Sequence, residues 1–197
     1  MSIVFKLTTF EKKVIMSLYN RTPNRVGGGS KTNSNGLSFE GRTSLMESLD
    51  KHENIEIKKV GDEYQVLFNS KLFGYYTEKH SFYSTFLEKK NINWRGLISK
   101  KYLPDSVFIN LMNKTVYIIE KKFQEGSGSV DEKLQTCDFK KKIYTRLIEQ
   151  TGFKTEYYYL WNSWFLKDEY KDVKEYIHSV GCKYFIESIE LEELGIQ

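Results

Sequence analysis

A predicted β-hairpin carries three side chains that could act together chemically. The segment 103–124 consists of two apolar stretches joined by a short polar turn, which predicts two paired strands. Asp105 stands at the open end of the first strand, and Glu120 and Lys122 stand near the end of the second. Charged groups at the end of an apolar hairpin are costly to bury unless they are paired or bind a ligand. These three residues are therefore the first candidates for a functional site.

The expected register of this hairpin brings the two acids together. When Asn110 pairs with Thr115 across the turn, the same count sets the two acids directly opposite each other. Opposed side chains in a sheet have Cβ atoms about 4.5–5.5 Å apart, close enough for two carboxylates to share a divalent cation. Alternation along the second strand then puts Lys122 and Gln124 on the same face as Glu120.

Two carboxylates and a lysine in this arrangement suit a magnesium ion that acts on a phosphodiester bond. Mg²⁺ prefers hard oxygen ligands, keeps several waters and takes its remaining ligands from phosphate groups. Held by Asp105 and Glu120, the ion would stabilise charge on the scissile phosphate and acidify a bound water. Lys122 would position or deprotonate that water. The hairpin therefore predicts metal-dependent hydrolysis of a phosphodiester.

The cysteines and histidines argue against other site chemistries. Cys137 and Cys182 have no CxxC spacing and no nearby histidine pair, so we expect two isolated free thiols in a reducing cytosol and no zinc site. His52, His80 and His178 are scattered along the chain and are expected at the surface. No nucleophilic triad is supported.

The composition is that of a globular protein. A chain of 197 residues with 40% hydrophobic and 28% charged residues is long enough to bury a real core, so we expect a single domain over residues 1–197. No apolar run reaches the length of a membrane span, and charge interrupts the N-terminal stretch too early for a signal peptide, so a cytoplasmic protein is expected. The net charge of +4 permits nucleic-acid binding without demanding it.

The order of predicted elements indicates the fold class α/β, with a mixed sheet and helices on its faces. Besides the hairpin, strands are expected at 55–60, 63–68, 71–76, 156–165 and 182–186. Helices are expected at 9–19, 37–49, 80–90, 130–151 and 167–180, the last closed by Gly181, and an acidic tail begins at 187. From residue 103 onward the order is strand, strand, helix, strand, helix, strand. The aromatic strand at 156–165 is expected in the core.

Two basic segments are candidate contacts for nucleic acid. Residues 20–36 form a Gly/Asn-rich stretch that includes Arg21, Arg25 and Lys31 and no acid. It is either a mobile linker or an arm that contacts phosphates and bases. The predicted helix at 130–151 has a lysine-rich side, which is either a solvated face or a contact to a phosphate backbone.

The motif formed by these hairpin residues resembles that of a known nuclease superfamily. Pro104-Asp105, then fourteen residues, then Glu120-Lys121-Lys122 resembles the PD-(D/E)xK nucleases, best known for the type II restriction endonucleases. The flanking elements are similar too, since members carry a helix ahead of the hairpin and a helix, strand, helix and strand after it. The resemblance implies a restriction-endonuclease-like core.

The resemblance also implies a role for each residue of the motif. Asp105 and Glu120 would hold the metal, and Lys122 would be the catalytic lysine. Glu40, in an upstream predicted helix, looks like the auxiliary acid that many members carry near the metal, although the helix dipole alone also accounts for a carboxylate in a first turn. Gln124 is similar to a polar residue often found just beyond the motif. Without a ligand, the hairpin charges would form an ordinary cross-strand ion cluster.

The function implied is a Mg²⁺-dependent endonuclease that hydrolyses double-stranded DNA, most simply a sequence-specific type II restriction enzyme. A homodimer is expected, because palindromic duplex sites are read by two-fold symmetric proteins. The alternatives are a non-specific, repair or junction-resolving nuclease of the same superfamily, or a nucleic-acid-binding module without catalysis. The residues expected to contact DNA are Arg21, Arg25, Lys31, Asn33, Asn35, Arg42, Arg95, Gln124, Lys133 and Lys140.

Overall fold

The computed structural model describes residue 39 and residues 45–126 and 130–196. All of these residues belong to one unit of the chain, which spans Thr32–Gln197. The predicted helix at 9–19 and the basic arm at 20–36 lie outside the described residues, so the expectation of a single domain over 1–197 stays a prediction. Within the described part, no helix has the length and apolar character that a membrane crossing requires.

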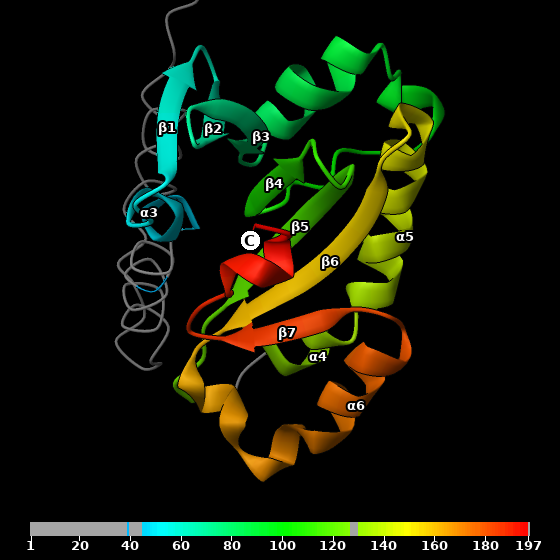
Figure 1. Ribbon diagram of the computed structural model, residues 1–197. Helices are drawn as coiled ribbons and strands as arrows, with labels where there is room; N and C mark the ends of the chain where they lie inside the picture. Colours follow the sequence, from blue (N-terminus) through cyan, green and yellow to red (C-terminus); the bar gives the residue numbers. More distant parts are fainter. Residues whose placement is uncertain (1–38, 40–44, 127–129, 197) are drawn as a thin grey trace, which may run out of the picture. The chain divides into compact units, whose positions relative to one another are not determined.

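The core of the fold is a seven-stranded sheet whose strands follow one another in chain order (Figure 1). The strands are β1 (Ile55–Val60), β2 (Glu63–Phe68), β3 (Lys71–Thr77), β4 (Ser106–Asn110), β5 (Thr115–Lys122), β6 (Lys154–Trp161) and β7 (Lys183–Ile186). The pairs from β1 to β5 are antiparallel, whereas β5, β6 and β7 are parallel. The prediction of a mixed sheet in an α/β fold is therefore confirmed.

Tight turns join the first three strands. Gly61 has a φ of 62°, and Asn69 and Ser70 have φ values of 49° and 62°, which are left-handed conformations suited to short hairpins. The first two predicted strands have the expected bounds, and the third ends one residue later, at Thr77.

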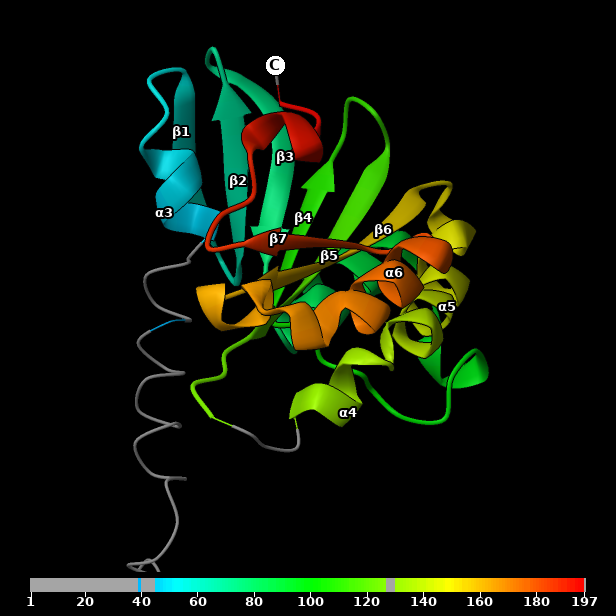
Figure 2. The same cartoon turned by 90° about the horizontal axis from the view of Figure 1, so that it is seen from below.

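Each face of the sheet carries its own apolar cluster. On one face, Val107 and Ile118 pack with helix α5 (Cys137–Ile148) and the helical segment η1 (Phe82–Leu87). On the other face, Phe108 and Ile119 pack with helix α3 (Leu45–Asp50) and the C-terminal segment η7 (Leu191–Leu194). Figures 1 and 2 show α5 and η7 on opposite sides of the sheet. Because both faces are covered, β4 and most of β5 are buried.

The segment predicted as one helix at 80–90 has a different geometry. Residues Phe82–Leu87 form a π-helix, which continues as a 3₁₀-helix, η2 (Glu88–Lys90). The buried residues of the π-helix are two adjacent pairs four positions apart, namely Phe82, Tyr83, Phe86 and Leu87. The prediction of a helical segment here is confirmed, whereas its π and 3₁₀ geometry was not predicted.

The helix predicted at 130–151 is broken near its start. It consists of α4 (Val130–Leu134), α5 (Cys137–Ile148) and a 3₁₀ turn, η4 (Glu149–Thr151). The break follows from hydrogen bonding, because the Thr136 and Tyr159 hydroxyls both donate to the carbonyl of Lys133, at 2.7 Å and 3.2 Å. The apolar residues of this segment that face the core are buried: Leu134, Cys137, Ile143, Tyr144, Leu147 and Ile148.

The aromatic strand ends earlier than predicted. β6 stops at Trp161 and a 3₁₀ turn, η5 (Ser163–Leu166), follows. The side chain of Asn162 causes the change, because it accepts a hydrogen bond from the Gln124 N–H at 3.1 Å and donates to the Gln124 carbonyl at 2.9 Å. Tyr157 to Trp161 are buried, so the expectation that this strand belongs to the core is confirmed.

The helix predicted at 167–180 begins as a 3₁₀ turn, η6 (Asp168–Tyr170), and continues as α6 (Lys171–Ser179). Gly181 follows it with a φ of 70°, as expected for a helix end.

The C-terminal residues are not a free acidic tail. Leu194 and Ile196 are buried in the apolar cluster on the α3 side of the sheet. The Asn110 amide donates a hydrogen bond to the Leu194 carbonyl at 2.9 Å. Apolar residues between the acids account for the difference from the prediction.

Cys137 and Cys182 are free and buried, but they are not isolated from each other. They share a hydrogen bond, which lowers the pKa of Cys137 and raises that of Cys182. This contact joins the start of α5 to the residue before β7 and could not be read from their separation in the sequence.

Candidate active site

The hairpin has the register that the sequence predicted. Asn110 pairs with Thr115, and the ladder continues to Ser106 opposite Ile119. One further step along both strands reaches Asp105 and Glu120. The two acids therefore stand at the same end of adjacent antiparallel strands, where the last ladder pair holds them in register.

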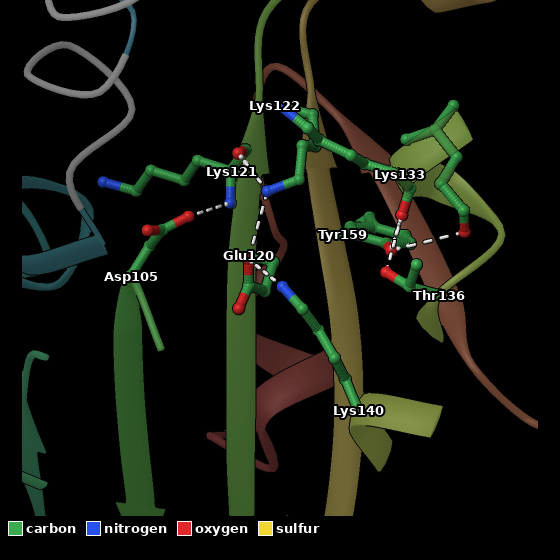
Figure 3. Close-up of polar contacts among 9 residues, drawn as sticks. Asp105, Glu120, Lys121, Lys122, Lys133, Thr136, Lys140 and Tyr159 are labelled. Carbon is green, nitrogen blue, oxygen red and sulfur yellow. Dashed lines mark hydrogen bonds and ion pairs between the residues drawn. The ribbon is translucent and has the colours of Figure 1, made fainter. Parts of the chain in front are cut away.

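Glu120 is the centre of the polar cluster (Figure 3). Its side chain is only 5% exposed, and its Oε2 lies 3.0 Å from Lys122 Nζ and 2.9 Å from Lys140 Nζ. Lys122 follows on the same strand, whereas Lys140 reaches the carboxylate from α5. A buried carboxylate needs such partners, because an unpaired charge in the core is strongly destabilising.

Asp105 joins the start of β4 to the end of β5. Its Oδ2 accepts a hydrogen bond from the Lys121 N–H at 2.8 Å (Figure 3). The Lys121 carbonyl in turn accepts a hydrogen bond from Lys122 Nζ at 3.0 Å. Oxygen atoms of Glu120 and Lys121 thus converge on one ammonium group.

Three buried tyrosines surround this cluster. Burial raises the pKa values of Tyr144 and Tyr157, and the negative charge of Glu120 raises them further. The Tyr144 hydroxyl has no hydrogen-bond partner within the described part of the chain. The ring of Tyr159 lies beside Lys122, with its centroid 5.9 Å from Nζ, and burial raises its pKa as well. All three phenols are therefore neutral near pH 7 and can act as hydrogen-bond donors.

The sequence argument missed two features of the site. Lys140 was expected only as a DNA contact, and Tyr144 was not assigned to the site. Both lie on α5 four positions apart, the spacing that puts two side chains on one helical face. That spacing was the available signal, but only the packing of α5 on the sheet shows that the face meets Glu120.

The other predicted DNA contacts in the described region have different environments. Gln124 is 2% exposed and close to the cluster, with its backbone tied to Asn162. Lys133 belongs to α4, beside the Tyr159 hydroxyl. Arg95 is exposed and stacks on Trp94, with its guanidinium carbon 4.5 Å from the ring centroid. DNA binding by these residues stays a prediction.

Several predicted site residues lie outside the described part of the chain, and nothing is concluded about them. They are the auxiliary acid Glu40 and the predicted DNA contacts Arg21, Arg25, Lys31, Asn33, Asn35 and Arg42.

The chemistry of the donor set fits a magnesium ion. Asp105 and Glu120 supply carboxylate oxygens at one end of the hairpin, and the Lys121 carbonyl points toward the same ammonium as Glu120. Within the stretches the structure describes, no three His, Cys, Asp or Glu side chains gather closely enough to form a fuller metal cage. Mg²⁺ suits so few protein ligands, because it keeps several waters and takes others from phosphate.

Comparison of the chain with models of protein families, with characterised proteins and with solved structures finds no match.

Proposed function

We propose that this protein is a Mg²⁺-dependent DNA endonuclease of the PD-(D/E)xK type and that its sheet is a restriction-endonuclease-like core. The observation that carries the proposal is the cluster of Asp105, Glu120 and Lys122 at one end of the β4–β5 hairpin. Burying a carboxylate together with two lysines directed at one of its oxygens has a high desolvation free energy, which a purely structural hairpin does not require. The cluster is well suited to hold a cation against an anionic substrate.

In this proposal, each residue of the cluster has a separate task. Asp105 and Glu120 would hold the magnesium ion, which supplies charge stabilisation at the scissile phosphate and an acidified water. Lys122, fixed between the Glu120 carboxylate and the Lys121 carbonyl, orients the attacking water. The hydrogen bond from the Lys121 N–H fixes the Asp105 carboxylate relative to β5.

Lys140 competes with the metal for the same carboxylate oxygen in this proposal. Lys140→Met is expected to strengthen Mn²⁺ binding about tenfold, because Glu120 Oε2 loses one of its two cationic partners. Cleavage of DNA should become slower, because the variant also lacks the positive charge that Lys140 is predicted to place against a DNA phosphate. The measurement is Mn²⁺ titration by calorimetry, and Lys142→Met, an exposed lysine of the same helix paired with Asp138, is the matched control. Unchanged Mn²⁺ affinity in Lys140→Met would remove the competition from the proposal.

An exposed basic and aromatic surface precedes Asp105 in the chain and is a candidate DNA contact. Arg95 lies over Trp94, and Lys101 Nζ lies 5.2 Å from the centroid of the same ring. Phe139, which is 52% exposed, packs on Tyr102 beside them and precedes Lys140 in α5. Cations and aromatic rings of this kind suit phosphates and bases. A homodimer on duplex DNA would bring two such surfaces and two active sites together.

The direct test is digestion of a supercoiled plasmid by purified protein in Mg²⁺, with Ca²⁺ in place of Mg²⁺ as the control for metal identity. Discrete fragments are expected for a sequence-specific restriction enzyme. A smear, or preference for branched DNA, would favour a non-specific, repair or junction-resolving nuclease. If no nucleic acid is cut in Mg²⁺ or Mn²⁺, the proposed activity is wrong.

A nucleic-acid-binding module without catalysis is the second candidate, and one observation favours it. Glu120 is paired with both Lys122 and Lys140, and Asp105 accepts a hydrogen bond from the Lys121 N–H, so both carboxylates already have partners within the protein. The cluster can therefore be stable without a metal ion. Binding of DNA without cleavage and without detectable Mn²⁺ binding would favour this candidate.

A further inference from the structure

A second candidate site lies beside the carboxylate cluster. A cavity of about 940 Å³ opens between α4, the turn after β6 and α6. Its walls include the aromatic residues Trp164, Tyr170 and Tyr176 and the charged residues Lys167 and Asp172. Cavities of this size with aromatic walls and a few polar groups typically bind small planar ligands or parts of larger ones.

The aromatic residues are held so that their rings form the walls. The Trp164 indole N–H donates to the Tyr170 hydroxyl at 2.9 Å, and the Tyr176 hydroxyl donates to the Gln135 carbonyl at 3.3 Å. Trp164 and Tyr176 are half-buried, whereas Tyr170 is buried. The polar ends of the two half-buried residues are thus used within the protein, so the rings present mainly apolar surface to the cavity.

The charged residues of the cavity indicate a polar ligand. Lys167 Nζ lies over the Trp164 ring, 3.0 Å from its centroid, so a cation and an aromatic surface occupy one wall. Glu169 and Asp172 supply carboxylates on the same cavity. Carboxylates accept hydrogen bonds from exocyclic amino groups, such as N4 of cytosine. A nucleotide combines a stacking face, in many bases an amino group, and a phosphate. The aromatic rings, the two carboxylates and the Lys167 ammonium of this cavity are the corresponding groups.

The side chain of Tyr159 links the carboxylate site to a wall of the cavity. The Tyr159 ring lies beside Lys122, and its hydroxyl donates to the Leu134 carbonyl at 3.3 Å. Leu134 also lines the cavity. Glu120 is near the carboxyl end of β5, and the cavity turn follows the carboxyl end of the neighbouring parallel strand β6 (Figure 1). Ligands of α/β sheets bind outside the carboxyl ends of such strands.

We infer that this cavity binds an unpaired nucleobase of the DNA strand whose phosphate lies at Glu120 and Lys122. The inference rests on the proposed function and extends it, because it assigns the substrate an unpaired or extruded nucleotide next to the cut. Stacking on Trp164 and Tyr176 supplies affinity, and Asp172 with Glu169 favours a base that carries an amino group. The preferred substrate is then duplex DNA with a short single-stranded extension or a flipped base.

The experiment measures binding separately from cleavage. Two labelled probes share one duplex sequence: one is blunt, and the other carries a short unpaired dC extension. Anisotropy titrations in Ca²⁺ are expected to show about tenfold tighter binding of the extended probe by the wild-type protein. Trp164→Ala should abolish this preference. Leu166→Ala is the matched control, because Leu166 is 61% exposed on the same turn and does not line the cavity.

A second variant tests the inference even if Trp164→Ala does not fold. Asp172→Asn keeps the side-chain shape and is expected to reduce the preference for a dC over a dT extension about fivefold. Equal binding of blunt and extended probes by wild-type protein that cuts DNA would overturn the inference and leave the proposed function intact. Preference for the extended probe without any cleavage would support the base site and reject the nuclease. Absence of DNA binding and cleavage would reject both.

Discussion

Lys122→Met is expected to slow Mg²⁺-dependent DNA cleavage about a thousandfold while the protein stays folded. Lys122 Nζ is fixed by Glu120 Oε2 and the Lys121 carbonyl, each at 3.0 Å, so the ammonium group has a defined position near any phosphate bound by the acids. Methionine has nearly the same length and fills the same space without the charge. Glu120 keeps Lys140 at 2.9 Å, so it is not left as an unpaired buried charge.

The rate is measured by single-turnover cleavage, with Mn²⁺ affinity and thermal stability recorded for the same protein. Lys154→Met is the matched control, because Lys154 is exposed at the far end of the adjacent strand β6, opposite Thr115 in the register. Both variants lose one positive charge, so a general effect of charge on DNA binding would appear in both. Wild-type cleavage by Lys122→Met would refute the assigned role of this lysine.

Gly74→Ala is expected to destabilise the protein by about 3 kcal/mol, which is large for the addition of one methyl group. A Cβ at Gly74 would lie 2.4 Å from the Ile109 carbonyl oxygen and 3.2 Å from a ring carbon of Phe108. Gly74 pairs with Asn110 on β4, and the Ile109 carbonyl lies on the same strand. Because β4 is paired on both sides within the sheet, moving this carbonyl would disrupt the backbone hydrogen bonds of the sheet. The steric clash, and not backbone conformation, is the cause.

Thermal unfolding measures the effect, and a fall in melting temperature of roughly 6–12 °C corresponds to this free energy for a domain of this size. Gly96→Ala is the control, because a Cβ at Gly96 would meet no atom within 4 Å. Equal melting temperatures for the two variants would show that β3 and β4 are less closely packed than described. Since β4 begins next to Asp105, Gly74→Ala is also expected to weaken metal binding.

Much of the central sheet followed from local sequence signals. The bounds of strands β1 to β3 were predicted within a residue because hydrophobic alternation and turn residues such as Gly61 and Asn69 act over a few positions. The pairing of Asn110 with Thr115 was predictable for the same reason, since a short turn leaves little freedom in register. The helix at 130–151 was predicted as continuous because its periodicity is continuous. At the break, the Lys133 carbonyl accepts hydrogen bonds from Thr136, which is local, and from Tyr159, which lies on a strand 26 residues later.

The candidate site also has one part that local sequence predicts and another that depends on tertiary packing. The sequence by itself determined that Asp105, Glu120 and Lys122 stand at one end of the hairpin, because a hairpin register is a local property of the chain. Only the tertiary structure decided that Lys140 shares the Glu120 oxygen and that Tyr144 and Tyr157 surround it. These contacts depend on how α5 packs across the sheet. The cavity of Trp164 and Tyr176 likewise exists only because the turn after β6 packs against α4 and α6, since no local pattern specifies which segments meet there.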